Sequence, residues 1–191
     1  METREAIFGR RSVRKYIDKP IDDEILKDLI EGALMAPSAD NRQPWYFVVV
    51  KSEENMEKLR KIFQDVSEKT RPQLEERFSN HPEVVGETLG FLKSLGNTSV
   101  CVLAFLLKPS YKGDVSLIQS VSAAVENLCL LAHDKGIGSC WMTAPISAGY
   151  SEVLKSEFAP EAGDFVAAIT LGYSAFVPKA PKRKEGRYKI I

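Results

Sequence analysis

Four short runs are almost continuously apolar and rich in β-branched or aromatic residues, a pattern typical of strands buried on both faces. They cover residues 45–50, 99–107, 139–143 and 165–171. Between them, apolar residues recur every three or four positions, which predicts helices. These helices cover residues 3–8, 20–34, 53–78, 82–95, 114–135 and 147–158. Strands alternating with helices predict an α/β or α+β domain. Because neither a repeat nor a linker interrupts the pattern, we expect a single domain over residues 1–191.

Two of the helical segments carry further predictions. Pro72 lies inside the segment 53–78 and predicts a break in that helix. The segment 114–135 is apolar over much of its circumference, so it should be buried on more than one side. In a chain of this length, such burial favours a second subunit.

Membrane insertion and secretion are not expected. The chain is charged from Glu2 onward without an apolar leader, and we expect no stretch that approaches the roughly 20 apolar residues of a spanning helix. The cysteines Cys101, Cys129 and Cys140 have no Cys-x-x-Cys spacing, which argues against a zinc or iron–sulfur site. An odd number of cysteines suits a reducing compartment, so we expect a cytoplasmic protein without a bound metal.

The charges balance overall but not locally. Lys plus Arg is 26 and Asp plus Glu is 26, so the net charge of zero argues against nucleic acid as a main partner. Residues 1–20 hold six basic and three acidic side chains (6 − 3 = +3). Residues 179–191 hold six basic side chains and Glu185 (6 − 1 = +5), which leaves −8 in between. Two basic ends therefore flank an acidic body, which leaves room for a small local anion site.

The usual constellations of catalytic side chains are absent from the sequence. His81 and His133 have no paired nucleophile spacing, and Gly136-Ile137-Gly138 is too short for a dinucleotide fingerprint and is explained by a helix cap. We therefore expect a bound cofactor to carry any redox or group-transfer chemistry. Cys140, inside an apolar run, is interpreted as a core residue in preference to a redox group.

Two polar segments are candidates for holding such a cofactor. The segment Arg10-Arg11-Ser12-Val13-Arg14 places three guanidinium groups and a hydroxyl together, as planar recognition of a phosphate requires. Taken alone, it is equally compatible with a solvated basic turn. The loop 36–45 offers Asn and Gln amides that suit the edge of a heteroaromatic ring, although a hydrogen-bonded turn also explains it.

The order and spacing of these segments resemble the nitroreductase family of FMN-dependent oxidoreductases. The resemblance covers residues 4–183 and is most specific at Pro37-Ser38-x-x-Asn41-x-Gln43-Pro44-Trp45. It continues through Gly136-Ile137-Gly138-Ser139-Cys140-Trp141, then Leu171-Gly172-Tyr173 and a Lys-Arg tail. The resemblance implies an α+β fold, a central mixed sheet flanked by helices, in an interlocked homodimer with FMN at the subunit interface.

The resemblance also implies roles for particular residues. Those on the phosphate, ribityl and pyrimidine side are Arg10, Arg11, Ser12 and Arg14, with Arg14 as the electrostatic stabiliser. The other subunit would supply Pro37, Ser38 and Asn41, with Gln43 nearby. A backbone N–H in the strand of Trp141, Met142 and Thr143 would donate to flavin N5. A tail over about 174–191, with Lys182 and Arg183, would close on the phosphate or the partner subunit.

This sequence departs from the family pattern at two places. Met142 and Thr143 stand where some members have a hydrophobic residue followed by an acidic one. Pro181 precedes Lys182-Arg183, whereas the family tail often has Lys-x-Arg, so either Lys179 or Lys182 is a candidate for the phosphate.

We expect an oxidoreductase that transfers hydride from NADH or NADPH through FMN to a nitroaromatic, quinone or similar conjugated acceptor, with ping-pong kinetics. Specialised flavin chemistry, such as dehalogenation or flavin cleavage, and a non-catalytic FMN-binding protein stay open as alternatives. The segment 64–95 falls where related enzymes roof the substrate pocket. Phe78, His81 and Phe91 are candidates for lining that pocket, or are ordinary surface and core residues.

Overall fold

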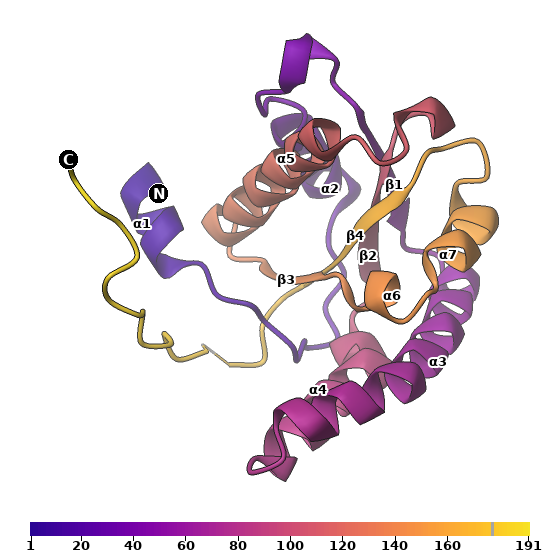
Figure 1. Cartoon of the computed structure of the whole chain (residues 1–191), viewed down its shortest axis with the longest axis vertical. Helices are drawn as coiled ribbons and strands as arrows, with labels where there is room; N and C mark the ends of the chain where they lie inside the picture. Colours follow the sequence, from indigo (N-terminus) through magenta and orange to yellow (C-terminus); the bar gives the residue numbers. More distant parts are fainter. Residues whose placement is uncertain (177) are drawn as a thin grey trace.

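A four-stranded sheet forms the centre of the computed structural model (Figure 1), which describes residues 1–176 and 178–191. In spatial order the strands are Trp45–Val50 (β1), Val100–Leu106 (β2), Phe165–Gly172 (β4) and Gly138–Met142 (β3). Each neighbouring pair is antiparallel. Across the described residues, the parallel component of the sheet is the single bridge between Ser12 and Ser139. The expected α+β fold is confirmed, and the sheet is mixed only through that bridge.

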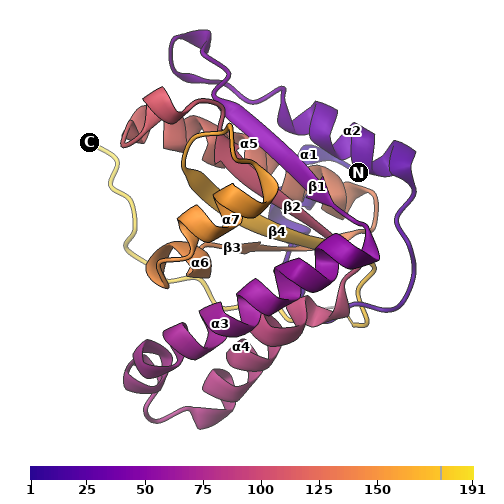
Figure 2. The same ribbon diagram turned by 90° about the vertical axis from the view of Figure 1, so that its right-hand side faces the viewer.

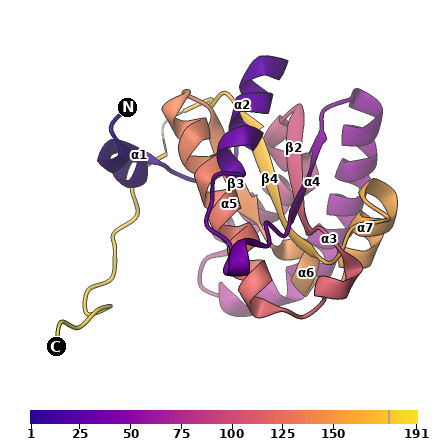
Figure 3. The same ribbon diagram turned by 90° about the horizontal axis from the view of Figure 1, so that it is seen from above.

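Helices cover both faces of the sheet, so that the molecule has three layers (Figures 2 and 3). On one face lie Asp23–Ala33 (α2) and Val115–Asp134 (α5), with Thr3–Gly9 (α1) beyond them. On the other face lie Glu53–Arg77 (α3), Pro82–Ser94 (α4) and Ser151–Phe158 (α7). The short Ala144–Ser147 (α6) and the 3-10 turns Ala39–Asn41, Leu95–Asn97 and Pro109–Tyr111 complete the elements.

The strands are apolar on both sides because each side faces a layer of helices. On β2, Val100, Val102, Ala104 and Leu106 pack into the core beneath α2 and α5. The alternate residues Cys101, Leu103 and Phe105 pack into the core beneath α3 and α7. All seven residues of β2 are buried, which is the physical reason for the continuous apolar run in the sequence.

Two helix predictions are corrected. Helix α3 continues through Pro72 to Arg77. A proline removes one helical hydrogen bond, here the bond to the carbonyl of Glu68, and both Glu68 and Pro72 are exposed residues. The helix expected over 147–158 begins only at Ser151, as α7, because a turn at Gly149, whose φ is +79°, separates it from α6, which ends at Ser147.

Helix α5 is also long and apolar enough to meet the length and composition of a membrane span, contrary to expectation. It packs within this chain against α1, α2 and the sheet, and eight of its residues are buried. Its apolar character is therefore that of a core helix. Ile118, Ala123, Leu130 and Leu131 remain half-buried along it.

Candidate functional site

The basic segment near the N-terminus forms an extended strap, defined here as residues 10–16, that runs from α1 along the edge of β3. The Val13 N–H donates to the Ser139 carbonyl at 2.9 Å, and the Tyr16 N–H donates to the Gly96 carbonyl at 3.0 Å. The side chains of Val13 and Tyr16 are buried. The Tyr16 hydroxyl donates to the Val13 carbonyl at 2.7 Å and lies 2.8 Å from Thr170 Oγ1. These contacts anchor the strap to the sheet.

Two glycines allow the strap to lie this close. A Cβ on Gly138 would lie 2.7 Å from Val13 Cγ2, and a Cβ on Gly96 would lie 2.6 Å from the Arg14 carbonyl oxygen. Gly96 also has φ +66°, in the left-handed region that favours glycine. The backbone position of the strap therefore depends on the absence of side chains at these two positions.

The strap and the C-terminal tail line an open cavity of about 370 Å³, here called the cationic cavity. Its lining residues are Arg10, Arg11, Ser12, Arg14, Pro178, Lys179, Pro181 and Arg183. Arg10, Ser12 and Arg14 are alternate residues of an extended segment, so their side chains share one side, and Arg11 lines the cavity as well. Five lining residues are cationic and none is acidic, a donor set that suits a phosphate.

The three arginines of the strap have different surroundings. Arg10 Nε donates to Glu126 Oε1 on α5 at 3.2 Å. Arg11 Nη1 donates to the carbonyls of Phe8 and Arg10, at 2.8 and 2.6 Å, so it also caps the end of α1. The guanidinium carbon of Arg14 lies 5.9 Å from the centre of the Phe91 ring on α4. No short-range sequence pattern indicates Glu126, because its link to Arg10 spans 116 positions.

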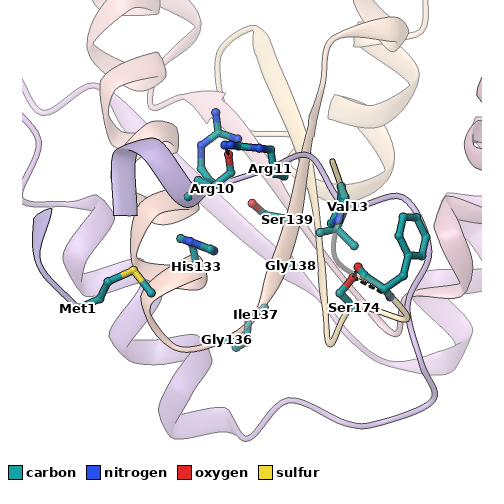
Figure 4. A pocket seen from close by; sticks show the side chains of 13 residues that line it. Met1, Arg10, Arg11, Val13, His133, Gly136, Ile137, Gly138, Ser139 and Ser174 are labelled. Carbon is teal, nitrogen blue, oxygen red and sulfur yellow. Dashed lines mark hydrogen bonds between the residues drawn. The ribbon is translucent and has the colours of Figure 1, made fainter. Parts of the chain in front are cut away.

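The tail contacts the strap where the Ala175 N–H donates to the Lys15 carbonyl at 3.1 Å. Further along the tail, Lys179 and Arg183 line the cationic cavity, whereas Lys182 is not among its lining residues. The structure thus favours Lys179 over Lys182 as the second tail cation beside the strap. A neighbouring cavity of about 300 Å³ shares Arg10, Arg11 and Pro178 with it. Figure 4 shows His133 and Ser139 among the side chains around this second cavity.

The other predicted polar segment lies apart from the strap. None of Pro37, Ser38, Asn41 and Gln43 lines the cationic cavity. Pro37, Asn41 and Gln43 are exposed and Ser38 is half-buried. The loop is fixed to the N-terminal half of α5, where the Ala39 N–H donates to Ser120 Oγ at 3.1 Å.

Within the loop, the backbone is held in an unusual conformation. Asp40, Asn41 and Gln43 have φ of 52°, 51° and 46°, which is uncommon for residues other than glycine. The Gln43 N–H donates to Ser38 Oγ at 3.0 Å, and Gln43 Nε2 donates to Asn41 Oδ1 at 3.2 Å. The loop therefore presents Asn41 and Gln43 outward as one hydrogen-bonded unit.

The strand β3 offers an open edge beside the strap. The Ser139 carbonyl, which accepts from the Val13 N–H, points to this outer edge of β3. Every second residue of a strand directs its backbone N–H and C=O to the same edge, so the backbone groups of Trp141 point there too. The strap turns away to Gly96 before it reaches Trp141. The backbone N–H of Trp141 therefore lies on the edge of β3 that faces the strap. Met142 is buried and Thr143 is exposed.

The three thiols have a packing role. Cys101, Cys129 and Cys140 are buried and unpaired with one another. Burial raises the pKa of Cys129 to about 11 and also raises the pKa of the Cys101 and Cys140 thiols. Neutral, buried thiols are poor nucleophiles at physiological pH, which agrees with the core interpretation of Cys140.

The helical hairpin α3–α4 projects beyond the sheet (Figure 2). Phe78 lines a cavity of about 300 Å³ between the two helices, together with Val85 and Leu89. His81 is exposed at the start of α4, with Nδ1 3.2 Å from Glu83 Oε1. Phe91 is buried in the core beneath Arg14. A substrate pocket lined by these residues stays a prediction.

Comparison with known proteins gives concordant results. The model of the nitroreductase family matches residues 7–173. A Bacillus subtilis protein named "Putative NAD(P)H nitroreductase YfhC" is 30% identical over 182 residues, which cover 94% of this chain and 88% of the relative. A BluB-like flavoprotein from Clostridium difficile has a similar structure (TM-score 0.77, 28% identity, 100% and 99% of the two chains covered). So does a nitroreductase with bound FMN from Bacteroides fragilis (TM-score 0.76, 25% identity, 100% and 99% covered).

Proposed function

Because this chain belongs to the nitroreductase family of oxidoreductases, we propose that it binds FMN and transfers hydride from NADH or NADPH to a conjugated acceptor. Nitroaromatic compounds and quinones are the acceptor classes. The observation that carries the proposal is the cationic cavity, where Ser12 and five cationic side chains surround a volume of about 370 Å³. A solved structure of similar fold, from Bacteroides fragilis, contains FMN.

The residues of the cavity divide into those that hold a phosphate and those that meet the ring. Arg10, Ser12, Lys179 and Arg183 would hold the phosphate, while Arg14 places a fixed positive charge on the pyrimidine side of the ring. Such a charge favours the reduced cofactor, in which negative charge develops on that side. FMN itself supplies the hydride chemistry once it is bound, which is consistent with the absence of a side-chain acid–base pair in the motifs of the sequence.

A homodimer completes the proposed site. In one subunit, Pro37, Ser38, Asn41 and Gln43 do not line the cationic cavity that the strap forms. Each subunit thus offers two separate sets of cofactor ligands, which a second copy brings together. Exposed apolar residues support such association, among them Ile7, Phe8, Met35 and Phe176. The three free thiols suit a cytoplasmic location for this dimer.

Turnover by the purified protein tests the proposed function. With added FMN, oxidation of NADH or NADPH should depend on a nitroaromatic or quinone acceptor, and double-reciprocal plots should be parallel as ping-pong kinetics require. Loss of FMN itself, or consumption of a halogenated compound without nitro reduction, would favour the specialised alternatives. Bound FMN that neither nicotinamide cofactor reduces would favour a non-catalytic flavoprotein.

Mixed dimers test the sharing of the site. A strap variant, Ser12→Ala/Arg14→Ala, and a loop variant, Ser38→Ala/Asn41→Ala, should each lose FMN binding. Unfolding and refolding equal amounts of the two together should restore about a quarter of the FMN sites, because half of the dimers are mixed and each mixed dimer contains one site with neither defect. No restoration would contradict a site built from both subunits.

A further inference from the structure

The link between Arg10 and Glu126 joins the cationic cavity to the core helix α5. Arg10 Nε donates to Glu126 Oε1 at 3.2 Å, with side-chain exposures of 27% for Arg10 and 43% for Glu126. The segment of α5 around Glu126 is held by the buried neighbours Ala124, Val125, Leu128 and Cys129. The carboxylate is therefore attached to a rigid part of the fold.

A guanidinium group has two donor edges, and this contact involves its Nε. The hydrogen bond to Glu126 leaves the terminal Nη donors of Arg10 available to the cationic cavity that Arg10 lines. Arg11 differs, because its Nη1 is already bonded to two backbone carbonyls. Arg10 therefore differs from Arg11 in that its Nη donors are not already bonded to backbone carbonyls.

We propose that Glu126 is a positioning residue that holds the guanidinium of Arg10 toward the phosphate of FMN, an inference that rests on the proposed function. A flexible arginine loses side-chain entropy when it binds an anion, and a prior hydrogen bond to a rigid helix reduces that loss. Glu126 would thereby favour flavins that carry a phosphate over flavins that do not.

The negative charge of Glu126 also repels a phosphate, so orientation and repulsion have opposite effects on affinity. Glu126 is not among the residues that line the cationic cavity, whereas Arg11, Arg14, Lys179 and Arg183 all are. The cavity thus keeps four positive charges beyond the Arg10–Glu126 pair. For this reason we expect orientation to outweigh repulsion.

The affinities for FMN and riboflavin, measured by quenching of flavin fluorescence, separate positioning from general structural support. Glu126→Ala should weaken FMN binding about tenfold, the lower range for a hydrogen bond to a charged group, and leave riboflavin affinity unchanged. Glu126→Gln should stay within about threefold of the parent for FMN, because an amide oxygen still accepts from Nε. Unchanged riboflavin binding also shows that the variant is folded.

A double variant tests whether Glu126 acts through Arg10. Once Arg10→Ala has been introduced, Glu126→Ala should cause no further loss of FMN affinity. Glu31→Ala is the matched control, since it removes an exposed carboxylate of α2 that pairs with Lys27 at 3.7 Å. The control should bind both flavins as the parent does.

The outcomes distinguish this inference from the proposed function. If the parent binds FMN but Glu126→Ala binds it equally well or more tightly, the positioning role is wrong and the proposed function stands. Equal losses for FMN and riboflavin would also overturn the positioning role. A parent protein that binds no FMN would overturn the proposed function first, and the positioning role with it.

Discussion

Gly138→Ala tests how closely the strap must lie against β3. A Cβ at this position would lie 2.7 Å from Val13 Cγ2, 2.8 Å from Val13 Cβ and 2.9 Å from Val13 Cγ1. Rotation about χ1 of Val13 moves the two methyl groups but not Cβ, so the contact can be relieved only if the backbone of the strap moves. The substitution therefore displaces the segment that carries Arg10, Ser12 and Arg14.

The expected size of the effect follows from two opposing contributions. Overpacking of a well-packed contact costs about 1–3 kcal/mol. Replacing glycine by alanine recovers about 0.4–1 kcal/mol through the lower entropy of the unfolded chain. We expect a net loss of about 1–2 kcal/mol in the free energy of unfolding, and a loss of about tenfold in FMN affinity, which corresponds to about 1.4 kcal/mol.

Urea unfolding of the apoprotein, followed by tryptophan fluorescence, measures the first quantity, and quenching of flavin fluorescence measures the second. Gly90→Ala is the matched control, because a Cβ on Gly90 meets nothing within 4 Å. Being in helix α4, it should raise stability by up to about 1 kcal/mol without changing FMN affinity. A Gly138→Ala variant that is as stable as the parent and binds FMN equally well would contradict the close packing of the strap on β3.

Three further predictions concern the tail, the strap and the thiols. Arg183→Ala should weaken FMN binding and make the affinity less sensitive to salt. Lys182→Ala should do neither, because of these two residues only Arg183 lines the cationic cavity. Equal effects of the two variants on FMN affinity, titrated at two salt concentrations, would contradict the role of Arg183. Arg11→Ala should lower the free energy of unfolding by about 1 kcal/mol, because the bonds of Arg11 to two carbonyls are lost. Ser12→Ala should instead weaken FMN binding with little change in stability. Urea unfolding in which Ser12→Ala is the less stable variant would contradict this division of roles. Burial holds the Cys129 thiol protonated to about pH 11, whereas the unfolded chain releases this proton near pH 8.5. The raised pKa of Cys129 therefore contributes fully to the free energy of unfolding below about pH 8.5. This contribution is lost between about pH 8.5 and 11, by about 1.4 kcal/mol per pH unit. A Cys129 thiol that reacts with Ellman's reagent at pH 8 as fast in the native protein as in urea would contradict its burial.

The elements of the fold were predictable because their causes are local. A strand between two helical layers must be apolar on both sides, and the run 99–107 shows this directly. The break expected at Pro72 was wrong because one proline at an exposed position does not end this helix of 25 residues. The rule that a proline breaks a helix uses only the sequence around the proline and does not include its exposure in the fold.

The site was predictable only in part, for the same reason. Arg10, Ser12 and Arg14 alternate in the sequence, so their common side follows from an extended backbone. The contacts of Arg10 with Glu126 and of Arg14 with Phe91 join distant segments, and no short-range pattern indicates them. The choice between Lys179 and Lys182 depends on the path of a tail without regular secondary structure, which the sequence left open.

The most direct test of the proposed function is an anaerobic titration of the FMN-loaded protein with NADH and with NADPH. We predict that at least one of them bleaches the flavin absorbance with one equivalent of reductant per FMN, and that a quinone or nitroaromatic compound then restores it. Bound FMN that neither nucleotide bleaches, or a protein that retains no FMN, would contradict the proposal.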